Sequence, residues 1–183
     1  MPNTTHVALL RGINVGRAKR IAMADLRALV ASLGFADVRT LLNSGNVVYR
    51  ATGVRPADAA ARIERALGDT LGVASRVTVL TVRELADVVA GNPWPDVPDA
   101  SRLWVTLVAD PADLARLAPL AERAWETERL AIGARAAYAW CPDGMLRSAL
   151  PDLMARALRD AATVRNWATV QKLLALAAAP AGA

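Results

Sequence analysis

Basic residues and glycines gather in one short segment near the N-terminus, where their chemistry suits the binding of an anion. Between residues 11 and 20 the sequence holds Arg11, Gly12, Asn14, Gly16, Arg17, Lys19 and Arg20. A guanidinium can fork onto a phosphate or a carboxylate, and glycine lets backbone N–H groups approach a ligand closely. The spacing is neither that of a Walker loop nor that of the G-x-G-x-x-G dinucleotide motif. The segment therefore predicts an anion site without naming the ligand.

A second polar segment, Asn43-Ser44-Gly45-Asn46, lies between two apolar runs and is typical of a hairpin turn. In a β-α-β-β order the first two strands run in the same direction, so both end at the same edge of the sheet. The basic segment and this turn should therefore lie side by side. We expect Ser44, Gly45 and Asn46 to add short polar groups to the site.

A third candidate segment lies near the C-terminus. Thr163 is predicted to cap the last helix, whose free N-terminal amides favour an anion, and Arg165 adds positive charge there. We expect Arg165 and Asn166 to share one cleft with the basic segment and the hairpin turn. The same residues also fit a plain helix cap, with Trp167 packed in the core.

A simpler interpretation of all three segments stays open, in which glycine and asparagine serve only turns and the basic side chains are only solvated. Other chemistry has little support, because the chain holds a single histidine, His6, and a single cysteine, Cys141. One cysteine excludes a disulfide framework and a cysteine-based zinc site. No spaced pair of carboxylates suggests metal or glycoside chemistry. We expect no metal site, and the catalytic residues and any cofactor are unknown from sequence.

The positive charge of the chain is concentrated in its first 50 residues. They carry seven Lys or Arg and two Asp, which gives +5, whereas the remaining 133 residues hold 15 residues of each sign. A local excess of cations indicates an anionic partner better than the overall charge does. The nearly uniform use of arginine over lysine suggests a GC-rich, bacterial genome.

Apolar periodicity predicts a β-α-β-β-α-β order for the first 80 residues. Strands are expected at 6–10, 38–42, 47–50 and about 77–79, and helices at 23–33 and from Pro56 to about Leu71. A third helix should begin at Thr81, because Thr81 and Glu84 have the spacing of a capping box.

The second half partly repeats this order. Three prolines within residues 92–99 mark the one credible boundary. Beyond it we expect strands at 102–109, 129–132 and 136–140, with helices at 111–121, 152–159 and 166–178. The predicted fold class is α+β, with two ferredoxin-like β-α-β-β halves packed in one compact chain. The halves are expected at 1–91 and 100–183.

Length and hydropathy place the chain among globular proteins. With 183 residues and 54% hydrophobic residues, it can bury a core without disulfides or metal. The N-terminus has no basic region followed by an apolar stretch of the kind found in signal peptides. The longest uncharged apolar run, residues 173–183, is much shorter than the ~20 residues of a spanning helix. We therefore expect a cytoplasmic protein without a membrane partner; its oligomeric state is left open.

Four motifs follow one another along the chain: Leu9-Leu10-Arg11-Gly12-Ile13-Asn14-Val15-Gly16, Met23-Ala24-Asp25-Leu26-Arg27, Ser44-Gly45-Asn46-Val47-Val48 and Thr163-Val164-Arg165-Asn166-Trp167-Ala168-Thr169-Val170. In this order they resemble the bacterial proteins grouped as DUF1697, a domain of unknown function. The resemblance covers nearly the whole chain and implies a pair of ferredoxin-like α/β units with no established activity. Departures from the family pattern include Arg17 in place of Gly, Asn43 in place of Gln and Ala149 in place of Lys.

Three hypotheses of function follow from these residues. The first is a module that binds a small anionic ligand, phosphate-bearing or nucleotide-like, at the basic loop. The second is a nucleic-acid-binding module, which would need exposed aromatic residues on the sheet. The first half offers only Phe35 and Tyr49 for that purpose, so nucleic acid is the less favoured partner. The third is a transferase-type enzyme, for which no base, nucleophile or metal cluster is recognisable.

Overall fold

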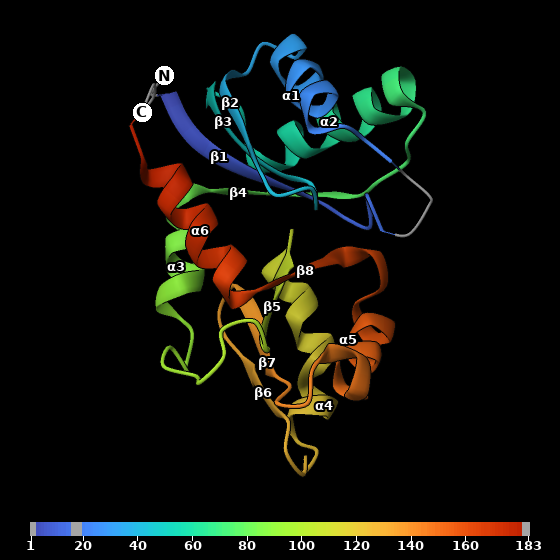
Figure 1. Cartoon of the computed structure of the whole chain (residues 1–183), viewed down its shortest axis with the longest axis vertical. Coiled ribbons are helices and arrows are strands. Elements are labelled where there is room, and N and C mark those ends of the chain that lie inside the picture. Colours follow the sequence, from blue (N-terminus) through green and yellow to red (C-terminus); the bar gives the residue numbers. More distant parts are fainter. Residues whose placement is uncertain (1–2, 16–19, 181–183) are drawn as a thin grey trace. The chain divides into compact units, whose positions relative to one another are not determined.

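The computed structural model describes residues 3–15 and 20–180, which form two four-stranded antiparallel sheets (Figure 1). The first sheet has the order β2-β3-β1-β4. Its strands are β1 (Asn3–Leu10), β2 (Ala36–Leu41), β3 (Asn46–Thr52) and β4 (Val77–Thr81). Residues 6–10, 38–41, 47–50 and 77–80 therefore share one sheet, as the apolar pattern predicts.

Two helices cover one face of the first sheet: α1 (Met23–Ser32) and α2 (Pro56–Leu71). Their buried residues recur at helical spacing, and Leu26, Ile63 and Leu67 are fully buried. They pack against alternate strand residues, among them Ala8, Leu10, Val47 and Tyr49. Alternate residues of each strand face the helices and, together with the apolar stripe on each helix, build one core.

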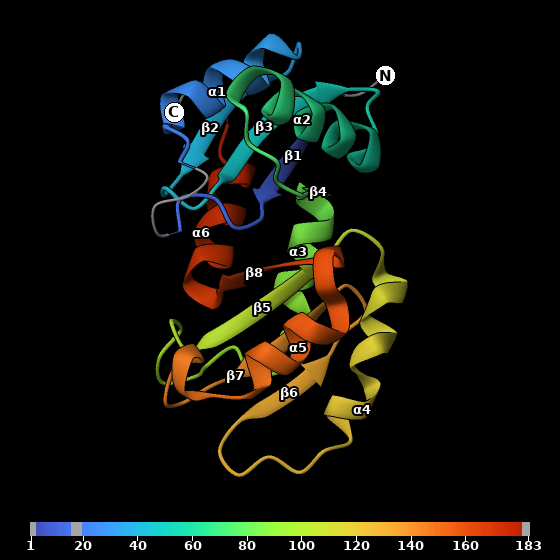
Figure 2. The ribbon, with the colours of Figure 1, turned by 90° about the vertical axis from the view of Figure 1, so that its right-hand side faces the viewer.

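The second sheet repeats this order as β6-β7-β5-β8. Its strands are β5 (Leu103–Val108), β6 (Arg129–Ile132), β7 (Ala136–Trp140) and β8 (Ala162–Asn166), and α5 (Leu150–Leu158) packs on one face (Figure 2). The core of this layer contains Leu114, Leu150, Met154 and Leu158. Both sheets therefore have the ferredoxin-like order, which confirms the predicted fold class.

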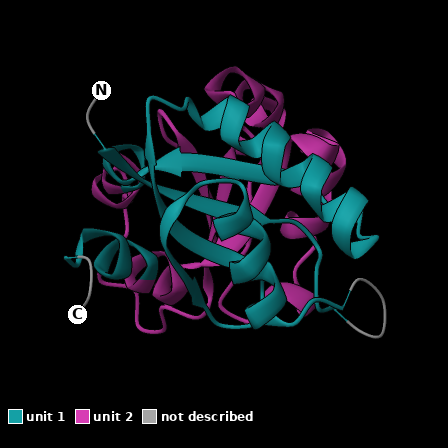
Figure 3. Ribbon diagram, turned by 90° about the horizontal axis from the view of Figure 1, so that it is seen from above, with its two compact units in different colours: residues 1–85, 173–183 teal, residues 86–172 magenta. Residues whose placement is uncertain are grey.

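A further helix follows the last strand of each sheet. α3 (Val82–Ala90) follows β4, and α6 (Trp167–Ala178) follows β8. By packing, the chain divides into a first unit, residues 1–85 with 173–183, and a second unit, residues 86–172 (Figure 3). The sequence-derived halves at 1–91 and 100–183 follow the order of elements along the chain, and that boundary stays a prediction.

One predicted element is wrong at the end of the second half. Residues 162–166 form strand β8, whereas the sequence pattern predicts no strand there and makes Thr163 the cap of the last helix. Thr163 pairs with Leu107 inside the sheet, so it lies four residues before α6. The cap is Asn166, whose Oδ1 accepts a hydrogen bond from the Thr169 N–H at 2.9 Å. The pattern of a run of five residues is too short to distinguish a strand from the start of a helix.

The segment at 111–121 does not form the single helix that the sequence predicts. It consists of a 3-10 segment, η1 (Pro111–Leu117), and one short turn of α-helix, α4 (Ala118–Ala121). Asp110 caps the 3-10 segment through the Ala112 N–H. Pro119 cannot donate the hydrogen bond that would continue an α-helix across the junction. Among residues 3–15 and 20–180, no helix has the length and apolarity needed to cross a membrane.

Candidate functional site

The loop after β1 and the turn between β2 and β3 lie side by side at one edge of the first sheet. The Leu10 N–H donates to the Gly45 carbonyl at 2.8 Å, and Leu9 pairs with Asn46 across the strands. This adjacency is the one that the strand order predicts. We call the described residues of this place, 11–15, 20–22 and 42–45, the loop edge.

Asn14 ties the two segments of the loop edge together. Its Nδ2 donates to the Asn43 carbonyl at 2.7 Å and to the Ile21 carbonyl at 2.9 Å, and its Oδ1 accepts from the Ile21 N–H at 2.8 Å. Asn14 has a left-handed backbone, with φ of 56°, a conformation that asparagine adopts more readily than most residues. We call this set of three hydrogen bonds the Asn14 clamp.

Gly45 and Asn46 shape the turn from inside. Gly45 has φ of 76°, and a Cβ there would lie 2.7 Å from the Leu10 Cβ, so the position needs glycine. Asn46 is 0% exposed, and its Nδ2 donates to the Leu41 carbonyl and to the Ser44 Oγ, both at 2.9 Å. Because Asn46 has no exposed surface, its amide supports the turn that presents Ser44.

Ser75, which lies two residues before β4, fixes the backbone of Arg11 from the other side. The Arg11 N–H donates to the Ser75 Oγ at 3.1 Å and to the Arg76 carbonyl at 2.9 Å, and the Ser75 hydroxyl donates to the Arg11 carbonyl at 2.9 Å. The neighbouring Arg76 side chain pairs with Glu64 at 3.2 Å. Sequence reasoning missed Ser75, because a single serine before a strand carries no motif.

Two consecutive backbone N–H groups of the loop edge are left for a ligand or water. Among the residues that the structure describes, the N–H groups of Gly12 and Ile13 pair with no acceptor. Gly12 is exposed, its φ is 64°, and no atom lies within 4 Å of where its Cβ would stand. Left-handed residues of this kind turn successive N–H groups toward a common side, a geometry that binds anions.

The positive charge of the loop edge comes from Arg11 and Arg20 within the described residues. Arg20 is exposed and forms no ion pair with any residue in the described ranges. Arg11 is partly exposed. The predicted site residues Gly16, Arg17 and Lys19 lie outside the residues that the structure describes.

Arg165 and Asn166 belong to the second unit and are described there. Arg165 is 8% exposed and lies in β8; its Nη1 donates to the Thr163 Oγ1 at 3.0 Å and to the Val164 carbonyl at 2.8 Å. Burial lowers the pKa of Arg165 to about 10, which still leaves a cation at neutral pH. Asn166 serves as the cap of α6. Their predicted convergence with Arg11 and Asn14 stays a prediction.

Among the other reactive side chains, His6, Cys141 and Ser148 are buried. Burial lowers the pKa of His6, which stacks on Tyr49 with ring centroids 5.5 Å apart. Cys141 is fully buried, and burial raises the pKa of its thiol. The Ser148 hydroxyl donates to Glu128 at 2.8 Å and lowers the pKa of that carboxyl. In the described parts of the chain, no cluster of histidine, cysteine and acidic side chains could hold a metal ion.

Solved structures and sequence families both match this chain. A conserved bacterial protein from Streptococcus pneumoniae has a similar structure, with a TM-score of 0.79 and 21% sequence identity. The similarity covers 96% of this chain and 99% of that protein. At that identity the likeness concerns the fold alone. No curated protein matches the chain.

The sequence family gives a closer assignment than the structural likeness. A model described as a protein of unknown function matches residues 3–138, a range that includes the whole loop edge, β5, β6 and the start of β7. The match agrees with the motifs around Arg11, Asp25 and Gly45. The chain therefore belongs to the DUF1697 family of proteins of unknown function.

Proposed function

We propose that this protein binds a small anionic ligand, one that carries a phosphate group, at the loop edge. The observation that carries the proposal is the pair of backbone N–H groups at Gly12 and Ile13, which pair with no acceptor among the described residues. They lie next to the Asn14 clamp, so the backbone that presents them is held in place before a ligand arrives. Preorganised donors lose little freedom on binding.

Some residues at the loop edge contact the ligand, and others hold those residues in position. The Gly12 and Ile13 N–H groups donate to the phosphate oxygens, and Arg20 supplies a cation from the same loop. Arg11 adds charge, and the exposed Ser44 adds a hydroxyl from the neighbouring turn. Asn14, Gly45 and Asn46 hold these groups in position. Arg165 and Asn166 remain candidates for further contacts, as the family motif suggests.

Binding of single-stranded nucleic acid on the sheet is less well supported. That mode stacks bases on exposed aromatic side chains. The two aromatic residues of the first half are buried, Phe35 at 5% exposed and Tyr49 at 0%. Neither ring has a free face for a base, so the observations favour a small ligand over an RNA strand.

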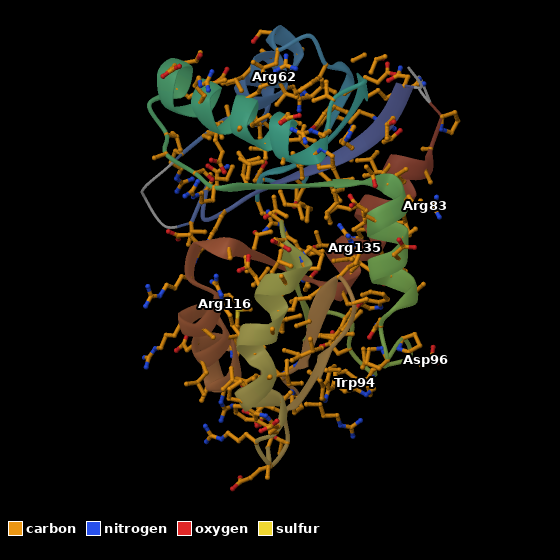
Figure 4. All side chains as sticks on the ribbon, turned by 180° about the vertical axis from the view of Figure 1, so that it is seen from behind. Arg62, Arg83, Trp94, Asp96, Arg116 and Arg135 are labelled. Carbon is orange, nitrogen blue, oxygen red and sulfur yellow. The ribbon has the colours of Figure 1, made fainter. Side chains whose placement is uncertain are left out.

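Calorimetric titration of the full chain with inorganic phosphate and pyrophosphate tests the proposal. We expect binding that Arg20→Gln weakens about three- to tenfold, the usual range for a charge-assisted hydrogen bond. Arg83→Gln is the matched control, because Arg83 is an exposed arginine that projects from α3, away from the loop edge residues (Figure 4). An equal loss in both variants would point to a diffuse effect of charge and would contradict a site at the loop edge.

A further inference from the structure

Two large apolar side chains are exposed at the loop edge, immediately beside the Asn14 clamp. Val15 is 71% exposed and Leu42 is 54% exposed. Val15 follows Asn14 in the chain, Leu42 precedes Asn43, and Arg20 precedes Ile21. The clamp joins Asn14, Asn43 and Ile21 by hydrogen bonds of 2.7–2.9 Å. Val15, Leu42 and the exposed Arg20 are therefore direct chain neighbours of the three residues that the Asn14 clamp joins.

Leu42 occupies a backbone conformation that its side chain disfavours. Its φ is 57°, in the left-handed region that glycine and asparagine adopt at lower cost. An exposed leucine there gains little from burial to offset that cost, so folding alone does not account for it. A strained and exposed apolar residue beside a ligand site is a reason to look for a role in binding.

From this combination we infer that the ligand carries an apolar or planar organic group next to its phosphate. The inference rests on the proposed function, since it concerns the same site. Arg20 and the Gly12 and Ile13 N–H groups recognise the anionic end of the ligand. Val15 and Leu42 cover its organic end and lose contact with water on binding. The ligand class is thus an amphipathic phosphate ester, such as a nucleoside monophosphate, rather than bare phosphate.

The class is tested with three probes that share a phosphate and differ in the attached group: inorganic phosphate, phenyl phosphate and adenosine 5′-monophosphate. We expect the two organic phosphates to bind the full chain about tenfold tighter than inorganic phosphate, the effect of burying roughly 50–60 Å² of apolar surface. Arg20→Gln should weaken all three by a similar factor.

Leu42→Asn separates a role in binding from a role in folding. Asparagine tolerates the left-handed backbone, so the melting temperature should stay the same or rise by about 1–3 °C. The same variant, and Val15→Ser, should weaken phenyl phosphate and adenosine 5′-monophosphate about three- to tenfold while inorganic phosphate binds as before. Leu146→Ser is the matched control, because Leu146 is fully exposed in the second unit; it should change nothing.

Two results would overturn the inference while leaving the proposed function in place. The first is equal binding of all three probes, and the second is loss of inorganic phosphate binding in Leu42→Asn. Absence of binding by every probe would instead contradict the proposed function itself. A single-stranded RNA hexamer separates a free nucleotide from a strand. Binding more than tenfold tighter than adenosine 5′-monophosphate would show that the partner is a nucleic acid and overturn the inference.

Discussion

Asn14 is the residue on which the geometry of the loop edge depends. One side-chain amide donates twice and accepts once, and its partners lie both in its own loop and in the turn between β2 and β3. In sequence, such a residue looks like a ligand contact, because the same amide chemistry serves both purposes. The structure uses it to hold the loop, and among the described residues the backbone N–H groups of Gly12 and Ile13 pair with no acceptor.

Replacing Asn14 should destabilise the first unit. Asn14→Ala removes three hydrogen bonds and places alanine at a positive φ, so we expect a loss of about 2–4 kcal/mol in the free energy of unfolding. Denaturation in urea measures it. Asn14→Asp keeps the acceptor but sets a carboxylate oxygen against the Asn43 and Ile21 carbonyls in place of the donor, so its loss should be at least as large. Equal stability of wild type and Asn14→Ala would show that the clamp does not form in solution.

Gly45 offers a separate test of how closely the turn approaches the loop. Gly45→Ala meets both a positive φ and the Leu10 Cβ at 2.7 Å, and we expect a loss of about 2–4 kcal/mol in the free energy of unfolding. Gly72→Ala is the control, because Gly72 has φ of 65° but open space around its Cβ position. It should cost only about 1 kcal/mol. Similar losses at both positions would contradict the close approach.

His6 predicts how stability changes with pH. Burial lowers its pKa in the folded state below the value of 6.5 that an unfolded chain shows, and Glu84 acts in the opposite direction with less effect. Well above pH 6.5 both states hold a neutral imidazole. As the pH falls below 6.5 the unfolded chain takes up the proton first, so stability decreases until the folded pKa is passed.

Unfolding of wild type and His6→Phe between pH 7.5 and 5 measures this difference. His6 is the single histidine of the chain, and phenylalanine preserves an aromatic ring against Tyr49. The variant should lack the part of the pH dependence that begins near pH 6.5. Parallel curves for the two proteins would show that His6 titrates alike in the folded and unfolded states.

At the scale of elements, the start of α6 shows where sequence patterns were insufficient. Residues 162–166 pair with β5, and only Val164 among them is exposed, but the run is too short for its pattern to exclude the beginning of a helix. Thr163 and Asn166 are both good capping residues, so residue type alone could not decide between them. The register of β8 against β5 decides it, and that register is a tertiary contact that no local pattern contains.

The cap assignment can be tested at Asn166. Asn166→Ala removes the acceptor for the Thr169 N–H and should lower the free energy of unfolding by about 1 kcal/mol. Asn166→Asp and Asn166→Ser retain an acceptor and should remain close to wild type. The measurement is thermal or urea unfolding of the three variants. No loss in Asn166→Ala would place the start of α6 elsewhere.

Other elements were predictable because their signals are local. The capping box before α3 forms as its spacing implies, since the Thr81 N–H donates to Glu84 at 2.8 Å and the Glu84 N–H donates to the Thr81 Oγ1 at 3.2 Å. Pro56 begins α2, and Gly72 ends it with a left-handed backbone. The strands around the turn at 42–45 also follow their apolar runs. Caps and turns of this kind depend only on residues close together in the sequence, so tertiary contacts do not alter them.

At the scale of the whole molecule, the two units repeat one strand order, 2-3-1-4 along each sheet. No repeat of residues accompanies the repeat of elements, so only the predicted order of strands and helices could reveal it. The division of the chain into two packing units could not be predicted from the order of strands and helices. Residues 173–183, at the end of the second half, belong to the first unit, because assignment to a unit depends on contacts distant in sequence.

Several features coincide at the loop edge of the first unit. Within the described residues it combines N–H groups at Gly12 and Ile13 that pair with no acceptor, the cation of Arg20 and the exposed apolar side chains of Val15 and Leu42. The net charge of +5 in the first 50 residues, with none in the rest, puts the electrostatic attraction for an anion in the same unit. The positive charge, the backbone N–H groups and the exposed apolar side chains therefore all favour the loop edge as the proposed anion site.

Backbone amide NMR during a titration with phosphate measures the central claim most directly, because it reports each N–H group separately. We expect the Gly12 and Ile13 resonances to move first and furthest, with smaller changes at Asn14, Arg20 and Ser44. Gly72 and Gly91, which lie outside the loop edge, should not move. A titration that leaves Gly12 and Ile13 unchanged while other amides respond would contradict the account, because it would put the anion site elsewhere in the chain.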